Sequence, residues 1–188
     1  MKLLWLDMET TGLDVADGHL PLEIAVMAAD NFTNPIAEYQ AVVKWDSGKA
    51  YMQCNEFSQK AHTRSGLLDR LDTGTPLEQV EQEILEFIDK HFPGEKPVIA
   101  GNSLGALDRP FIRHWFPRLE KRLHYRMLDV TAYRLGFVGL KLFPEVDKSK
   151  TAHRALDDIK ESVEEFNRYK EYLLRSQRLF AWAEVNSD

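Results

Sequence analysis

Apolar positions divide the first half of the chain into strands separated by polar turns. Residues 2–8 and 20–30 are nearly continuous apolar runs, as expected of buried strands, and 36–45 alternates in the manner of a half-buried strand. Residues 49–75 have no sustained period, which predicts an irregular stretch with short helical pieces.

The second half predicts helices that alternate with short strands. Pro76 opens a helix, apolar residues recur at helical spacing from Val80 to Ile88, and Pro93 ends it. The remaining predicted elements are a strand at 98–100, a helix from about 103 to 116, a strand near 125–130 and a long helix from about 155 into the 170s. Strands followed by alternating helices and strands indicate a mixed central sheet with helices packed against it, a three-layer α/β domain.

Length and composition suit one globular domain. The chain has 188 residues, 44% of them hydrophobic, so we expect a single domain over 1–174 and an extension over 175–188. The extension carries Leu179, Phe180 and Trp182, and it is expected either to dock on the body or to join a partner subunit.

The cysteine content and the lengths of the apolar runs indicate the cellular location of the protein. Cys54 is the only cysteine, which excludes an intramolecular disulfide and a four-thiolate zinc site and fits a reducing, cytoplasmic setting. Asp7 and Glu9 interrupt the first apolar run, which therefore predicts a strand and not a signal peptide. Because no apolar stretch approaches the roughly 20 residues that cross a bilayer, we expect no membrane partner.

The net charge of −6 argues against a nucleic-acid binder with a long footprint, because such proteins usually carry a basic excess. An enzyme that holds few phosphates through metal ions escapes this objection. Basic and aromatic residues are interleaved between Asp108 and Arg126, which is either a phosphate- and base-binding surface or a solvated helix face.

Two carboxylates converge at the end of the first predicted strand. Side chains alternate across a strand, so Asp7 and Glu9 project to the same face. Like charges on an otherwise apolar strand destabilise it unless a cation neutralises them, and magnesium or manganese prefer such oxygen ligands. The alternative is that the strand ends at the surface and both groups are solvated.

A second acidic segment near the C-terminus supports the metal-site interpretation. If the last helix begins near Ala155, then His153 lies on the loop before it and Asp158 lies within its first turns. Asp157 and Asp158 are about 100° apart on a helix, so only one of them faces inward easily. In the first segment, Gly12 permits a sharp turn that lets a nucleotide approach the backbone.

These segments resemble the DEDDh exonuclease superfamily, and within it the oligoribonuclease family. The similarity extends to about residue 174. Its most specific motifs are Trp5-Leu6-Asp7-Met8-Glu9 with Thr11-Gly12-Leu13, His62-Thr63-Arg64-Ser65-Gly66-Leu67, Gly101-Asn102-Ser103-Leu104-Gly105, His124-Tyr125-Arg126, Leu128-Asp129-Val130, and His153 through Ile159. The resemblance implies a ribonuclease H-like fold of three α/β/α layers, with a mixed five-stranded sheet.

The resemblance also implies an activity, namely 3′→5′ removal of 5′-mononucleotides from short single-stranded RNA by two divalent ions, Mg²⁺ or Mn²⁺. The implied metal ligands are Asp7, Glu9, Asp108 and Asp158. His153 is the implied general base, and the two ions are expected about 4 Å apart on either side of the scissile phosphate.

Substrate contacts follow from the same resemblance. Leu13 and Phe57 are expected to wedge against the terminal bases, although an isolated Phe is more often a core residue. Thr10 and His62 are expected to contact the substrate, and Ser103 to cap the far phosphate. Relatives form homodimers in which Tyr125 and Arg126 complete the partner's pocket.

Two departures from the family leave substrate choice open. Ala106 and Leu107 both separate Gly105 from Asp108, where relatives usually have one residue, so the phosphate cap and the length limit are uncertain. The Glu-Thr-Thr-Gly motif is shared with proofreading DNA exonucleases. The alternatives are therefore an exonuclease acting on single-stranded DNA or on longer RNA and, less favoured, a non-catalytic nucleic-acid-binding module. A nucleotide-binding protein is disfavoured because no Gly-rich phosphate loop is present.

Overall fold

The computed structural model describes residues 1–144 and 153–185, with side chains up to residue 177. Leu179, Phe180 and Trp182 of the expected extension therefore lie outside the described side chains. Five strands form one mixed sheet in the order β3-β2-β1-β4-β5, with β1 antiparallel to β2 and parallel to β4. Their bounds are β1 Leu3–Thr10, β2 Pro21–Asp30, β3 Asn34–Val42, β4 Ile99–Gly101 and β5 Met127–Asp129. The predicted strands and the mixed sheet are confirmed.

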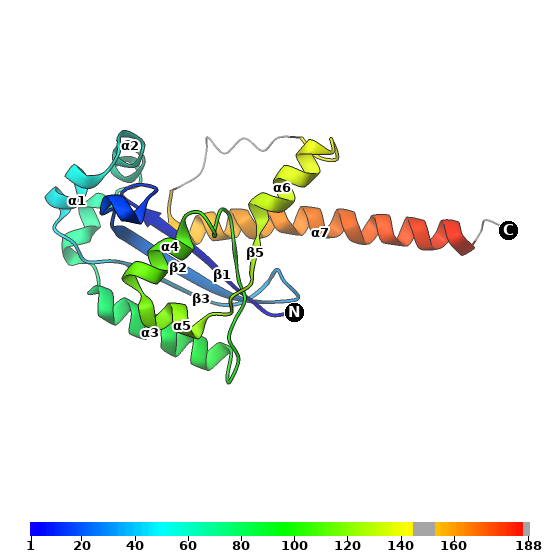
Figure 1. Cartoon of the computed structure of the whole chain (residues 1–188), viewed down its shortest axis with the longest axis horizontal. Coiled ribbons are helices and arrows are strands. Elements are labelled where there is room, and N and C mark those ends of the chain that lie inside the picture. Colours follow the sequence, from blue (N-terminus) through cyan, green and yellow to red (C-terminus); the bar gives the residue numbers. More distant parts are fainter. Residues whose placement is uncertain (145–152, 186–188) are drawn as a thin grey trace.

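Helices surround this sheet (Figure 1). They are the 3₁₀ helices η1 (Val15–Asp17) and η2 (Leu68–Thr73) and the α-helices α1 (Ser47–Gln53), α2 (Glu56–Arg64), α3 (Leu77–His91), α4 (Asp108–Trp115), α5 (Pro117–Arg122), α6 (Val130–Gly139) and α7 (Ala155–Val185). Two predictions needed correction. The helix expected from about 103 begins only at Asp108, and the sequence analysis missed α5 and α6.

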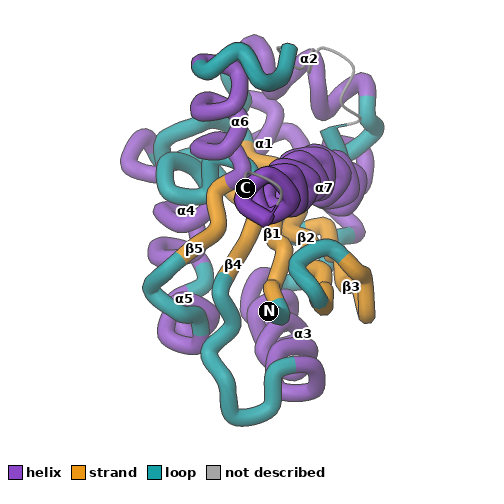
Figure 2. Tube along the Cα trace, turned by 90° about the vertical axis from the view of Figure 1, so that its right-hand side faces the viewer, coloured by secondary structure: helices purple, strands orange, loops and turns teal. Residues whose placement is uncertain are grey.

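The two faces of β1 pack against different helices. Leu4, Leu6 and Met8 join a core with apolar residues of α3, α4 and α5, whereas Leu3 and Trp5 join a core with α7. Figure 2 shows α7 on one side of the sheet and α3 on the other. This is the expected three-layer α/β/α arrangement.

The packing of α7 determines what meets the end of β1. Asp7 and Glu9 continue the face of β1 that begins with Leu3 and Trp5, because successive strand residues alternate. The rings of Trp5 and Phe166 lie 6.1 Å apart, so α7 starts at the C-terminal end of β1 and runs back along it. The first turns of α7 therefore reach the face that carries both carboxylates.

The loop after β4 brings α4 to the same end of the sheet. A Cβ on Gly101 would lie 2.6 Å from the carbonyl oxygen of Leu6, so only glycine permits this close approach. The loop then closes on itself, because Ala106 and Leu107 both donate their backbone N–H to the Ser103 carbonyl. This turn accommodates both residues that precede Asp108.

The last helix continues through residues 175–185 and extends past the body of the molecule (Figure 1). Within the described ranges, none of the helices combines the length and the apolar composition that crossing a bilayer requires.

Candidate active site

Three side chains from β1 and the start of α7 converge on one point. Glu9, His153 and Asp158 each offer a ligand atom, and these atoms all lie within 4.8 Å of one another. Glu9 is only 8% exposed, so the alternative of a fully solvated strand end is wrong for this residue. Asp157 is exposed, and of the two adjacent acids only Asp158 joins the group, as predicted.

The surroundings of Glu9 disfavour its negative charge. Burial, the neighbouring Asp158 charge and a hydrogen bond with Asp158 raise the pKa of Glu9 to about 9. The charges of Glu23 and Asp108 are smaller contributions to the same rise. A carboxyl group with such a pKa keeps a proton at neutral pH, and a cation bound between these acids would replace that proton.

Asp108 adds a third element to the site. It is the first residue of α4 and is 4% exposed. Burial raises its pKa to about 7, although backbone hydrogen bonds at Asp108 and Met8 act in the opposite direction. Because Met8 separates Asp7 from Glu9, the hydrogen bond at Met8 fixes the start of α4 beside both acids of β1.

Asp7 lies on the same face of β1 as Glu9 and is half-buried. Asp7 and Asp108 are outside the group whose ligand atoms lie within 4.8 Å, although Asp108 is close enough to affect the pKa of Glu9. The four predicted acids thus occupy one end of the sheet, and two of them approach each other and His153 most closely.

The chemistry of the donor atoms fits a hard divalent cation. Carboxylate oxygens predominate, as magnesium and manganese prefer, and one imidazole lies beside them. Glu9, His153 and Asp158 are therefore a candidate metal-binding group.

His153 lies on the loop before α7, as predicted. Its backbone φ of 52° is in the left-handed region, which is uncommon for residues other than glycine. Burial and the charge of Arg64 lower its pKa, so the imidazole is neutral at physiological pH and able to accept a proton. Its ring lies 5.5 Å from that of Phe57, edge to face.

The two predicted wedge residues are exposed beside this site. Phe57 is 68% exposed and Leu13 is 67% exposed, so the alternative that Phe57 is a core residue is wrong. Thr10 closes the neighbouring turn by donating its hydroxyl to the Gly12 carbonyl at 2.7 Å.

His62 lies beneath the site. It is buried, and its Nε2 donates to the Thr10 carbonyl at 2.9 Å, while its Nδ1 lies 3.8 Å from Oε2 of Glu9. Burial lowers the pKa of His62, so its imidazole is neutral. Nδ1 has no hydrogen-bond partner among the described residues and faces the candidate metal-binding group.

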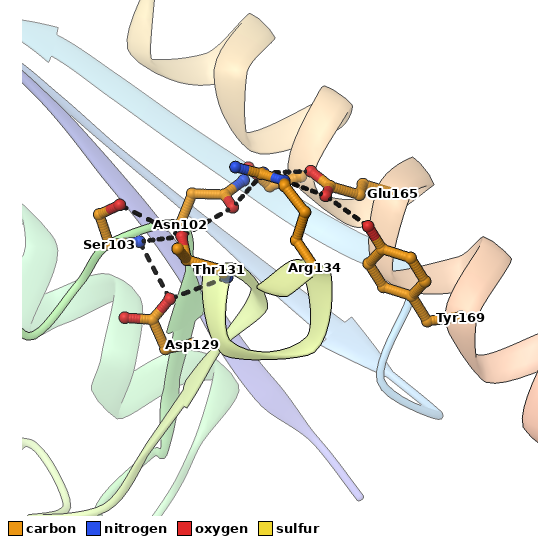
Figure 3. Close-up of polar contacts among 8 residues, drawn as sticks. Asn102, Ser103, Asp129, Thr131, Arg134, Glu165 and Tyr169 are labelled. Atoms are coloured by element: carbon orange, nitrogen blue, oxygen red, sulfur yellow. Dashed lines mark hydrogen bonds and ion pairs between the residues drawn. The ribbon is translucent and has the colours of Figure 1, made fainter. Parts of the chain in front are cut away.

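A polar network holds Ser103 in place (Figure 3). Its backbone N–H donates to Asp129 and to the Thr131 hydroxyl, each at 3.0 Å, and its φ of 57° is left-handed. Asn102 accepts from Arg134 at 2.7 Å, and Arg134 forms an ion pair with Glu165 at 2.5 Å. The loop that carries Ser103 is thus tied to both α6 and α7.

Tyr125 and Arg126 are exposed, with the Arg126 guanidinium 5.3 Å from the Tyr125 ring. Buried Arg109 supports this segment by donating to the carbonyls of His124 and Tyr125. In the register of the sheet, Trp5 is level with Ala100 and Ala100 with Leu128. Tyr125 lies three residues before Leu128, and Glu9 lies four residues after Trp5, in the same strand direction. At about 3.3 Å per residue, the two residues are roughly 20 Å apart along the strand direction.

Sequence reasoning missed Glu23 and Arg154. Glu23 is fully buried, and Arg154 forms a bidentate ion pair with it. The shortest distance, between Nη2 of Arg154 and Oε1 of Glu23, is 2.7 Å. The available signal was the position of Glu23, a single acid within the apolar run Leu20 to Ala29, because a buried charge requires a partner.

Comparisons with known proteins agree with this geometry. The family model described as exonuclease matches residues 4–166. A protein of Francisella tularensis subsp. tularensis named oligoribonuclease is 39% identical over 177 residues, which cover 92% of this chain and 96% of the relative. The chain belongs to the oligoribonuclease family of exonucleases.

A second relative and a solved structure are also similar to this oligoribonuclease family member. The oligoribonuclease of Corynebacterium diphtheriae is 38% identical, over 90% of this chain and 81% of the relative. A zinc-bound form of E. coli exonuclease I with single-stranded DNA superposes with a TM-score of 0.67 at 17% identity. That alignment covers 98% of this chain but 43% of exonuclease I, and at this identity it shows the fold alone.

Proposed function

We propose that the chain is a 3′→5′ exoribonuclease that hydrolyses short single-stranded RNA to 5′-mononucleotides. The observation that carries the proposal is the convergence of Glu9, Asp158 and His153 within 4.8 Å, in a chain whose relatives are named oligoribonuclease. The carboxylates can bind a cation that contacts the phosphodiester, and the neutral imidazole beside them can accept a proton during its hydrolysis.

Asp7, Glu9, Asp108 and Asp158 are the proposed ligands of two divalent ions, Mg²⁺ or Mn²⁺. Bound ions of this kind supply a Lewis acid and charge stabilisation at the phosphate. The chain contributes the acids and an imidazole that takes the proton of the attacking water, a role that suits His153 because its pKa is lowered.

Exposed apolar side chains beside His153 suit the terminal bases. The exposed ring of Phe57 offers a stacking surface that tolerates any base, and Leu13 offers an apolar wedge. We assign the contact near the terminal nucleotide to Thr10, whose carbonyl buried His62 supports from below, and the far phosphate to Ser103. The hydrogen bonds that hold Ser103 support its role as this cap, which would limit substrate length.

A homodimer is the proposed assembly. Tyr125 and Arg126 are exposed and lie too far from Glu9 of their own chain to serve its site, so we assign them to the site of a second copy. Apolar side chains exposed on α6, on the turn that follows it and on α7 offer a surface for that copy, and several of them line a groove of about 440 Å³. The exposed residues are Leu135, Leu140, Leu142, Leu173 and Leu174.

Single-stranded DNA and longer RNA are the competing substrates. The experiment compares RNA and DNA oligomers of two to ten nucleotides, labelled at the 5′ end, with Mg²⁺ and with Mn²⁺. The proposal predicts 5′-mononucleotides and the highest kcat/KM for the shortest RNA. Equal rates on DNA, or faster turnover of the longer strands, would replace it with the competing assignment.

A further inference from the structure

Glu23 connects the central sheet to the start of α7. It lies on β2 directly opposite Glu9 of β1, and its side chain is 0% exposed. One carboxylate oxygen accepts the backbone N–H of Ala155 at 3.0 Å, at the N-terminal end of α7. Anionic groups stabilise this end of a helix, because its backbone N–H groups lack partners within the helix.

Arg154 completes this connection. Its Nε and Nη2 both donate to the carboxylate of Glu23, with distances between 2.7 and 3.2 Å. A bidentate ion pair fixes orientation as well as distance. The two residues that follow His153 are therefore anchored to the strand that lies beside β1.

His153 needs such an anchor because of its backbone. A non-glycine residue at φ 52° is less stable than in the common regions, so the surrounding contacts must hold it there. The anchored residues Arg154 and Ala155 directly follow it, and Asp158 lies one turn further along the capped helix. The contacts of Glu23 thus anchor both His153, on the loop before α7, and Asp158, in the first turn of α7.

We propose that Glu23 is a positioning residue for the reaction: it holds the Arg154-Ala155 backbone so that His153 is fixed over Glu9. The inference rests on the proposed function, in which His153 accepts the proton of the attacking water. In this proposal Glu23 acts through its contacts with Arg154 and Ala155 and not through the substrate or the metal ions.

The test is the Glu23→Gln variant, which preserves the size of the side chain and removes its charge. We expect kcat for a short RNA to fall about 10- to 100-fold, as is usual when the partner of a functional side chain is lost, while KM stays within about 3-fold. Arg154→Met, which leaves the cap on Ala155 intact, should lower kcat in the same direction, and Arg154→Lys should restore part of it.

A second readout needs neither metal nor turnover. In the metal-free protein, the ¹H–¹³C signal of the His153 imidazole, assigned with His153→Gln, should shift or broaden in Glu23→Gln. Failure of wild-type turnover would contradict the proposed function, whereas an unchanged His153 signal would contradict the positioning role.

Glu81 provides a matched control on the opposite side of the sheet. It is 4% exposed, accepts the backbone N–H groups of Arg118 and Leu119 at the start of α5, and pairs with the Arg118 side chain at 2.8 Å. Glu81→Gln should lower Tm to a similar extent as Glu23→Gln while leaving kcat and the His153 signal unchanged.

Two kinetic outcomes would also overturn the positioning role. One is an equal fall in kcat in the Glu23 and Glu81 variants, which would indicate a general loss of stability. The other is a rise in KM without a change in kcat in Arg154→Met, which would indicate that Arg154 binds the substrate.

Discussion

Glu9 and Glu23 are opposite each other on the antiparallel strands β1 and β2, and both are buried, but among the described residues only Glu23 forms an ion pair with an arginine. Arg154 neutralises Glu23. Glu9 instead faces Asp158, and its pKa rises to about 9. Two adjacent carboxylates of the same type thus take different roles, one as a structural anchor and one as a proposed metal ligand.

The metal-free protein should lose stability as the pH rises. An unfolded chain releases the Glu9 proton near pH 4.5, whereas the folded chain keeps it to about pH 9. Between these values the folded state binds more protons, so the free energy of unfolding falls as pH increases. In EDTA, Tm should decrease from pH 5 to pH 9 more steeply for the wild type than for Glu9→Gln, and equal slopes would contradict the raised pKa.

Replacing His153 should affect turnover and not folding. His153→Ala is expected to lower kcat about 10²- to 10⁴-fold, because proton transfer to a positioned base is lost. Tm should change little, because the side chain is only partly buried. The control is His114→Ala, an exposed residue of α4, which should retain wild-type kcat. Retention of full turnover by His153→Ala would rule out its role as the base.

Replacing Phe57 should weaken substrate binding. Stacking of a base on an aromatic ring contributes about 1–3 kcal/mol, so Phe57→Ala should raise KM about 5- to 150-fold. Met52 is also exposed, on α1, and Met52→Ala is the matched control with an expected unchanged KM. If both variants behave like the wild type, the ring does not contact the substrate.

Shared sites in a homodimer predict complementation between inactive variants. Asp158→Asn lacks a ligand in its own site, and Arg126→Ala lacks a contact that it contributes to the partner's site. Random exchange of subunits should restore about a quarter of the wild-type sites, because each mixed dimer has one intact site. Absence of recovery after denaturation and refolding of the mixture would indicate sites built from one chain.

Most of the fold and the main site residues could be predicted because their patterns are local. The alternation along β1 predicted the common face of Asp7 and Glu9, and the family motif identified Asp158 as the acid of the last helix that joins them. Helix α6 was missed because its ten residues include two glycines and several β-branched or aromatic side chains, which weaken a helical pattern.

Contacts between side chains that are far apart in the sequence could not be predicted. The Glu23–Arg154 ion pair joins residues 131 positions apart, and no local pattern indicates which cation meets a given buried acid. The burial of His62 under Glu9 also depends on how α2 packs against the end of β1. Both features follow from tertiary structure alone.

The central claim is that Glu9 and Asp158, together with Asp7 and Asp108, hold divalent ions for hydrolysis beside His153. The most direct measurement is Mn²⁺ binding by calorimetry for the wild type and Asp158→Asn, in parallel with hydrolysis of a 5′-labelled RNA dinucleotide. We expect the wild type to bind Mn²⁺ and to release 5′-mononucleotide only when the ion is present, and we expect Asp158→Asn to lose both properties. Cleavage by the wild type in excess EDTA, or undiminished Mn²⁺ binding and cleavage by Asp158→Asn, would contradict it.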